Sequence, residues 1–188
     1  MCTVTKNCAH LIFLLSFSSL EYIIKMKTII IYESGTGFTE QYAKWISEAL
    51  DCECKKLKKV SPSELKEFDR IVFGGWIIGG GIMGLEKMRS IKKPFAVFAV
   101  GATPESKEIV SAIKTQNKLD DIPLFYMTGG FRFEKLNFLY RAMLKTLKKI
   151  VAKKTDRTSQ EEFMAQYLGT SFDHSEKSQI MPLVEYCR

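Results

Sequence analysis

The fold of this chain is decided by one stretch, Lys27-Thr28-Ile29-Ile30-Ile31-Tyr32, followed directly by Glu33-Ser34-Gly35-Thr36-Gly37-Phe38-Thr39. A β-branched run that ends in glycines and hydroxyl residues, and then opens into an amphipathic segment, predicts strand, loop and helix. Glycine lets the backbone turn tightly, and the first turn of a helix offers free N–H groups and a dipole that favours an anion. The stretch therefore predicts an anion site, to which Ser34, Thr36 and Thr39 add hydroxyl donors.

The spacing within this loop indicates which phosphate ligand it suits. A P-loop for nucleoside triphosphates ends in Gly-Lys-Ser/Thr, and this loop contains no lysine. A dinucleotide loop of the Rossmann type needs a third glycine where Glu40 stands, and it leaves the three hydroxyls unexplained. A phosphate monoester fits better, and an ordinary glycine-rich turn without a ligand is the alternative.

Composition indicates a single globular domain without disulfides or metal. The 188 residues are 46% hydrophobic and 26% charged, which is typical of a soluble domain that buries its own core. The five cysteines are an odd number, Cys52-Glu53-Cys54 lacks the C-x-x-C spacing, and only two histidines could complete a metal set. We therefore expect reduced thiols, no metal site and a cytoplasmic location.

Residues 1–25 differ from the rest of the chain. Their apolar stretch is interrupted by Ser16, Ser18, Ser19 and Glu21, and it is shorter than the ~20 clean apolar residues of a membrane span. A secretory signal would need a basic start and a small-residue cleavage site. We expect a disordered or non-native extension before a domain of residues 26–188, and a weak signal anchor is the alternative.

Strand and helix patterns alternate after the first loop. The expected strands are 52–57, 70–73, 94–100 and 124–128, and the expected helices are 39–50, a short one from 61, 84–91, 104–114, 134–153, 161–167 and 175–187. This alternation predicts an α/β fold with a doubly wound, five-stranded parallel sheet. The strand order 2-1-3-4-5 is favoured, and it brings the loops after strands one, three and four to one edge.

Two further loops at that edge are rich in glycine. Trp76 lies among five glycines between Gly74 and Gly81, where it could stack on a planar ring for ~0.5–1.5 kcal/mol beyond burial, or simply cap the sheet. The expected cofactor-binding residues are Ser34, Gly35, Thr36, Gly37, Phe38, Thr39, Gly75, Trp76, Ile77, Gly79, Gly101, Ala102 and Thr103. The loops contain no general acid, nucleophile with a base, or metal set. No catalytic residue is assigned, and the chemistry is expected to belong to a cofactor.

The pattern Ser34-x-Thr36-Gly37-x-Thr39 resembles the FMN phosphate loop of the flavodoxin superfamily. That resemblance implies FMN as the cofactor, but it leaves the 58 residues after Gly130 unexplained. A basic helix begins there, with an apolar stripe of Leu136, Leu139, Tyr140, Met143, Leu147 and Ile150 and an opposite face of Arg141, Lys145, Lys148 and Lys149. Residues 132–157 hold nine basic and two acidic residues, a local charge equal to the +7 of the whole chain.

This segment carries a second resemblance. Gly129-Gly130-Phe131-Arg132-Phe133, then Tyr140-Arg141-x-Met143 and Thr155-Asp156, are similar to the insertion of the flavodoxin-like, quinone-dependent protoporphyrinogen oxidases of bacteria. The resemblance covers Met26 to Arg188 and implies a basic helical insertion at about 131–173, FMN, a small planar substrate and a quinone acceptor. Where that family tends to carry tyrosine and histidine after the third strand, this chain has Gly79 to Gly81.

Several functions remain open at this point. An FMN oxidoreductase is favoured, and Arg141, Lys145, Lys148 and Lys149 are expected to bring it to the inner face of the membrane. A soluble electron carrier of flavodoxin type is the main alternative, although carriers usually present acidic surfaces. A flavin-free binding domain on the same fold is a third hypothesis. Nucleic acid is not expected, because no recognition module accompanies the basic charge.

Overall fold

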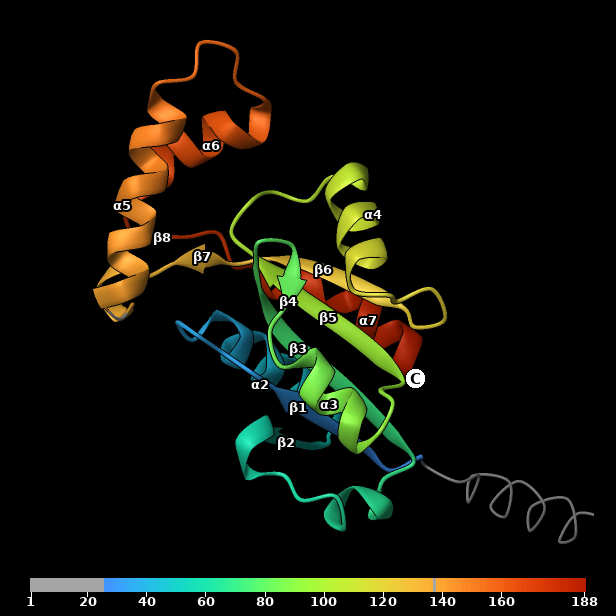
Figure 1. Ribbon diagram of the computed structural model, residues 1–188. Coiled ribbons are helices and arrows are strands. Elements are labelled where there is room, and N and C mark those ends of the chain that lie inside the picture. The colour runs from blue at the N-terminus through green and yellow to red at the C-terminus, as the bar shows by residue number, and fades with distance from the viewer. Residues whose placement is uncertain (1–25, 137) are drawn as a thin grey trace, which may run out of the picture.

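The computed structural model describes residues 26–136 and 138–188, so the expected extension at residues 1–25 lies outside the described residues. A parallel sheet forms the centre (Figure 1). Its strands are β1 Thr28–Tyr32, β2 Glu53–Lys56, β3 Arg70–Ile78, β5 Ala96–Gly101 and β6 Leu124–Thr128. Their order, β2-β1-β3-β5-β6, confirms the predicted doubly wound arrangement.

Helices cover both faces of the sheet, as the alternation predicts (Figure 1). They are α2 Phe38–Leu50, α3 Leu85–Ile91, α4 Lys107–Gln116 and α7 Met181–Cys187. On one face α2 and α7 bury Ile46 and Leu183 against Ile30 of β1. On the other face α3 and α4 bury Met88 and Ile113 together with Ile29 and Ile31. Strand β1 is therefore apolar on both sides, as a central parallel strand must be.

Strand β3 runs five residues further than predicted. The expected loop at Gly74 and Gly75 is instead buried strand, which pairs with β5 and then folds back as a hairpin with β4 Gly81–Ile82. Both glycines make room for packing, because a Cβ would lie 1.9 Å from the Phe98 ring at Gly74 and 2.5 Å from Ile82 at Gly75. The hairpin turns at Gly79 and Gly80, whose φ angles of 56° and 81° are those of a tight two-residue turn.

Several helix boundaries also differ from the predictions. Helix α4 begins at Lys107 rather than 104, because the Ser106 side chain caps it by accepting a hydrogen bond from the Ile109 N–H at 3.2 Å. The short helix expected from residue 61 is the 3-10 turn Glu64–Glu67. The expected C-terminal helix is two pieces, a 3-10 turn at Lys177–Ile180 and then α7, whose first turn holds the proline.

Residues 131–173, called the insertion below, leave the sheet after β6 and return before the last helix (Figure 1). Its two ends pair as antiparallel strands β7 Gly130–Phe131 and β8 Phe172–Asp173. Between them stand a 3-10 turn at Phe133–Lys135 and the contacting helices α5 Phe138–Ala152 and α6 Ser159–Tyr167. Helix α5 is shorter than predicted, since the chain from 133 to 135 forms the separate turn.

The predicted packing face of α5 is partly wrong. Leu139 and Ile150 belong to the predicted apolar stripe, but they are 75% and 56% exposed. Leu136, Tyr140, Met143 and Leu147 of the same stripe, together with Leu144, line a cavity. A helical period shows that a segment has an apolar side, but the position of its partner decides how much of that side is covered.

We expect Gly74→Ala to lower the free energy of unfolding by about 1–3 kcal/mol, because the new methyl group would overlap the Phe98 ring inside a filled core. Chemical denaturation measures this. Gly81→Ala is the matched control, since its Cβ would meet only the Ile78 carbonyl oxygen, at 3.5 Å, and should change stability by less than about 0.5 kcal/mol. Equal effects of the two substitutions would contradict the packing role of Gly74.

Candidate cofactor site

The loop from Glu33 to Gly37 joins β1 to α2 at the carboxyl edge of the sheet. The Glu33 N–H donates to the Gly74 carbonyl at 2.9 Å, which ties the loop to β3. The Gly37 N–H donates to Ser34 Oγ at 3.1 Å, and Gly37 takes a φ of 101° to begin the helix. Such a backbone conformation favours glycine, so Gly37 is the residue that allows the loop to enter α2.

One hydroxyl in the first turn of α2 lacks a hydrogen bond within the described part of the chain. Thr39 is 1% exposed, and within residues 26–136 and 138–188 its Oγ1 has no hydrogen-bond partner. A buried hydroxyl left unpaired costs about 1–3 kcal/mol, so Thr39 is a donor that an outside acceptor would satisfy. A phosphate oxygen seated at the start of α2 has the required chemistry.

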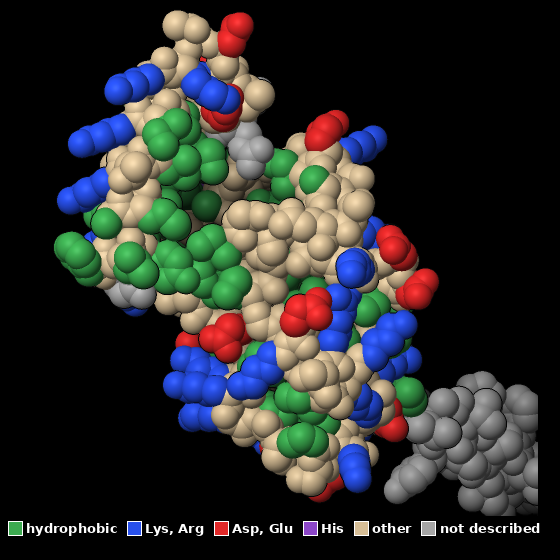
Figure 2. All heavy atoms as spheres, viewed as in Figure 1, with side chains coloured by type: hydrophobic (Ala, Val, Ile, Leu, Met, Phe, Trp, Pro, Cys, Tyr) green, Lys and Arg blue, Asp and Glu red, His purple; other side chains and the backbone are tan. Residues whose placement is uncertain are grey.

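An apolar cavity of about 590 Å³ opens beside the loop, between the sheet edge and the insertion. Figure 2 shows hydrophobic side chains gathered around this hollow. From the predicted set, Thr36, Phe38, Thr39, Trp76, Ile77, Gly79, Gly101, Ala102 and Thr103 line it. The insertion adds Tyr140, Leu144, Leu147, Phe163 and Tyr167, which the sequence analysis did not place at the site. Of the other predicted residues, Ser34, Gly35 and Gly37 lie in the adjoining loop, whereas Gly75 is packed inside β3 and does not line the cavity.

Trp76 lies between the loop after β1 and the insertion. Its indole lies so close to Gly35 that a Cβ there would be 3.1 Å from the ring. On the insertion side it meets Tyr140 edge to face, with ring centroids 6.3 Å apart at 81°. The two aromatic side chains thus form one wall of the cavity, in the orientation that aromatic pairs prefer.

The loop after β5 is held by Tyr126. Its hydroxyl donates to the Thr103 carbonyl at 2.5 Å. A Cβ on Gly101 would lie 2.1 Å from the Tyr126 hydroxyl oxygen. Burial, with a smaller contribution from the Glu105 carboxylate, raises the pKa of Tyr126 far above its ordinary value. The phenol therefore stays protonated, and Gly101 gives the loop the space that this hydrogen bond needs.

The β3–β4 hairpin is fixed by two amides at the end of α4. Gln116 Nε2 donates to the Gly79 carbonyl at 2.8 Å, and Asn117 Nδ2 donates to the Gly80 carbonyl at 2.8 Å. Asn117 Oδ1 accepts from the Ile82 N–H at 2.9 Å. The sequence analysis did not identify Gln116 or Asn117, because their partners lie 35 to 37 residues away in the chain. In the described part of the chain, no group of three or more His, Cys, Asp or Glu side chains could hold a metal ion.

Sheet order and loop positions define a flavodoxin-like α/β protein with a mononucleotide site at its topological switch point. The family model described as "Flavodoxin domain" matches residues 29–158, and the chain belongs to this family. It is an FMN-binding protein of redox type. The unpaired Thr39 hydroxyl and the adjoining apolar cavity fit the phosphate and the ring of FMN.

Solved structures similar to the chain include a flavodoxin from the domain Archaea, at 17% identity and a TM-score of 0.38 over 54% of this chain and 78% of that one. A flavodoxin from Bacillus cereus has 20% identity and a TM-score of 0.38 over 54% and 85%. The flavodiiron core of a Synechocystis protein has 15% identity and a TM-score of 0.40 over 65% of this chain and 34% of that one. None of the curated proteins matches the sequence.

We expect Thr39→Val to affect the apoprotein and the FMN complex in different ways. Valine keeps the shape but removes the unpaired hydroxyl, so the apoprotein should unfold at an unchanged or slightly higher denaturant concentration. FMN affinity, measured by quenching of flavin fluorescence, should fall by roughly tenfold or more, because a hydrogen bond to a charged phosphate is lost. Thr146→Val, on the exposed side of α5, is the control. Unchanged FMN affinity of the Thr39 variant would place the phosphate elsewhere.

Proposed function

We propose that this chain is an FMN-dependent oxidoreductase that oxidises a hydrophobic planar substrate and passes the electrons to a quinone. Protoporphyrinogen is the substrate implied by the resemblance of the insertion. The single observation that carries the proposal is that the insertion extends the apolar cavity of the cofactor loops, so that a substrate could lie against the flavin ring. Its volume of about 590 Å³ lies within the range of small-molecule sites.

The composition of the cavity supports an apolar substrate. Among its described lining residues there is no Asp, Glu, His, Lys or Arg. The walls are mainly apolar and offer ring contacts from the Trp76–Tyr140 pair and from the Phe163–Tyr167 pair. Bound FMN supplies the electron transfer, while the chain positions the two partners and controls their surroundings.

Each of the three loops would bind a different part of FMN. Ser34 to Thr39 would hold the phosphate, and Trp76 with Ile77 would contact the ring. The backbone of Gly101, Ala102 and Thr103 would bind the polar edge of the ring, in a loop already held by the Tyr126 hydroxyl. Gly79 would stay near the ring as part of a hairpin that Gln116 keeps in place.

The outer side of α5 supports contact with an anionic membrane surface. Phe138 and Leu139 are 86% and 75% exposed, and the exposed Lys145 and Lys149 lie on the same helix. A basic helix with exposed apolar side chains is suited to the headgroup region of a bilayer, where a quinone is available. No described helix has the length and apolar character needed to cross a bilayer.

Arg141, which the helical pattern places on one face with Lys145, Lys148 and Lys149, has a different role from these lysines. Its Nε donates to the Leu136 carbonyl at 2.8 Å, and its Nη2 donates to the Glu134 carbonyl. The side chain thus closes the turn before α5. Lys148 is half-buried, so the two exposed lysines are the better probes of membrane contact.

The enzymatic test uses the FMN-loaded protein, protoporphyrinogen and a soluble quinone without oxygen. We expect quinone-dependent oxidation of the tetrapyrrole. Leu147→Glu should lower kcat/KM at least about tenfold at unchanged flavin content, because it buries a charge in the apolar cavity. Leu147→Met, of similar volume, should stay close to the parent. A parent protein that exchanges electrons with protein partners but oxidises no tetrapyrrole would instead be an electron carrier.

For the membrane, we expect the double charge reversal Lys145→Glu and Lys149→Glu to weaken binding to vesicles of mixed neutral and anionic lipid at least about tenfold. Each cation near such a surface contributes ~1 kcal/mol, and the effect should shrink as salt rises. Reversal of the exposed Lys58 and Lys59, which precede β3, changes the net charge equally and serves as the matched control. Equal vesicle binding by the two variants would refute a docking role for α5.

A further inference from the structure

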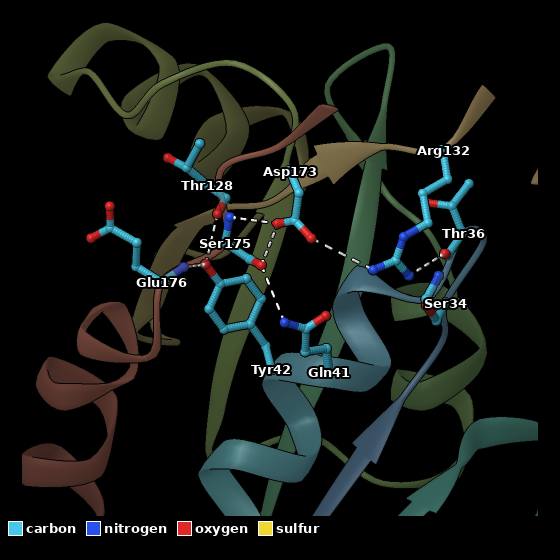
Figure 3. A network of polar contacts seen from close by, with 10 residues as sticks. Ser34, Thr36, Gln41, Tyr42, Thr128, Arg132, Asp173, Ser175 and Glu176 are labelled. Carbon is cyan, nitrogen blue, oxygen red and sulfur yellow. Dashed lines mark hydrogen bonds and ion pairs between the residues drawn. The ribbon is translucent and has the colours of Figure 1, made fainter. Parts of the chain in front are cut away.

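A guanidinium group from the insertion reaches the loop after β1. Arg132 follows β7, yet its Nη1 donates to the Thr36 carbonyl at 3.1 Å, across 96 residues of sequence (Figure 3). Its Cζ lies 4.2 Å from the centre of the Phe38 ring, at the start of α2. A Cβ on residue 37 would lie 2.8 Å from the same Nη1. The guanidinium therefore has room at this position because Gly37 has no side chain.

The contacts of Arg132 position it without using all its donors. Its Nη2 lies 3.7 Å from Asp173 Oδ2, which is too long for a hydrogen bond. The other Asp173 oxygen, Oδ1, accepts from the Ser175 N–H at 2.9 Å and from the Ser175 hydroxyl at 2.5 Å. Gln41 of α2 in turn donates to Ser175 Oγ at 3.2 Å, so the network returns to the helix that begins at the loop (Figure 3). Since arginine has five N–H donors, Arg132 retains donors for a further acceptor.

The charges around the loop leave a place for a cation. Glu40, in the first turn of α2, is neutralised by Lys44 at 3.0 Å and Lys56 at 3.2 Å. These contacts hold the pKa of Glu40 below its usual range, with the Lys44 hydrogen bond as the largest cause. The two lysines are therefore engaged, and the loop offers a phosphate neutral donors and the helix dipole, with the acidic Glu33 at its start. Arg132, whose side chain is 27% exposed and forms a 3.7 Å ion pair with the half-exposed Asp173, brings a positive charge beside these donors.

We propose that Arg132 is the counter-ion of the FMN phosphate, and that this contact makes the site select FMN over riboflavin. The proposal rests on the assignment of Ser34 to Thr39 as the phosphate loop. Arginine suits the role because its planar fork matches two phosphate oxygens and forms short, charge-assisted hydrogen bonds. The insertion then completes the cofactor site at its phosphate end as well as at its ring end.

The test titrates the apoprotein with FMN and with riboflavin, which differ only in the phosphate, and follows flavin fluorescence. Arg132→Gln should weaken FMN binding by about tenfold to a hundredfold and leave riboflavin binding within about twofold. Lys135→Gln removes the same charge from an exposed position three residues away and should leave both affinities unchanged. FMN binding by the parent should also fall more steeply with salt than that of the Arg132 variant.

An equal change in the two affinities on Arg132→Gln, whether it is zero or large, would overturn the proposal. Should that variant fold poorly, Arg132→Lys keeps the charge but loses the fork, and it should lose FMN affinity in part while riboflavin affinity stays unchanged. Thr39→Val distinguishes a failure of the Arg132 proposal alone from a failure of the phosphate-loop assignment on which it rests. If it lowers only FMN affinity while Arg132→Gln does not, the loop assignment stands and the counter-ion is wrong. If neither variant distinguishes the two flavins, the loop assignment itself fails.

Discussion

All strands of a parallel sheet end along the same edge, and the cofactor site of this protein depends on that constraint. Tyr32 at the end of β1 is paired with Gly74, and Gly101 at the end of β5 is paired with Thr128 at the end of β6. The loops that leave these strands therefore meet, although long stretches of sequence separate them. Because β1 turns toward β2 on one side and β3 leads to β5 on the other, a crevice opens between their loops.

The insertion builds on this edge and closes it. It departs directly after β6, and the pairing of β7 with β8 brings its two ends back together beside the start of α2. Its helices present aromatic and aliphatic side chains inward and lysines outward, so one segment provides both a cavity wall and a basic outer surface (Figure 2). The same segment supplies Arg132, which donates to the Thr36 carbonyl in the loop after β1. A cavity wall, a basic outer surface and this arginine thus belong to one segment of the chain.

Polar side chains around the site mainly hold backbone in place. Tyr126 holds the loop after β5, and Gln116 with Asn117 holds the hairpin after β3. Tyr42 plays the same part at the end of β6, where its hydroxyl donates to the Thr128 carbonyl at 2.6 Å and accepts from the Glu176 N–H at 3.1 Å. Burial raises the pKa of Tyr42 to about 12, so this phenol remains a donor. The cavity surface is left to apolar groups and backbone, which suits chemistry that belongs to a cofactor.

Local pattern was sufficient for much of this fold. The β-branched run from Thr28 to Tyr32, the glycines and hydroxyls after it, and the periodicity of α2 are properties of neighbouring residues, and they predicted β1, the loop and the helix correctly. The strand order also followed from the sequence, since alternating strands and helices permit few right-handed arrangements. The family match includes these local features but extends over residues 29–158.

Tertiary structure alone decided what fills the space beside a glycine and which way a helix faces. The glycine pattern predicts a loop at Gly74 and Gly75, but both lie in β3, where Phe98 and Ile82 occupy the space beside them. The exposure of Leu139 depends on where the sheet edge lies relative to α5, which periodicity does not reveal. Arg132 reaches Thr36 only because β7 and β8 pair, and no local signal encodes a contact between residues so far apart in the chain. Sequence thus determined the elements and their order, while long-range packing decided which side chains complete the site.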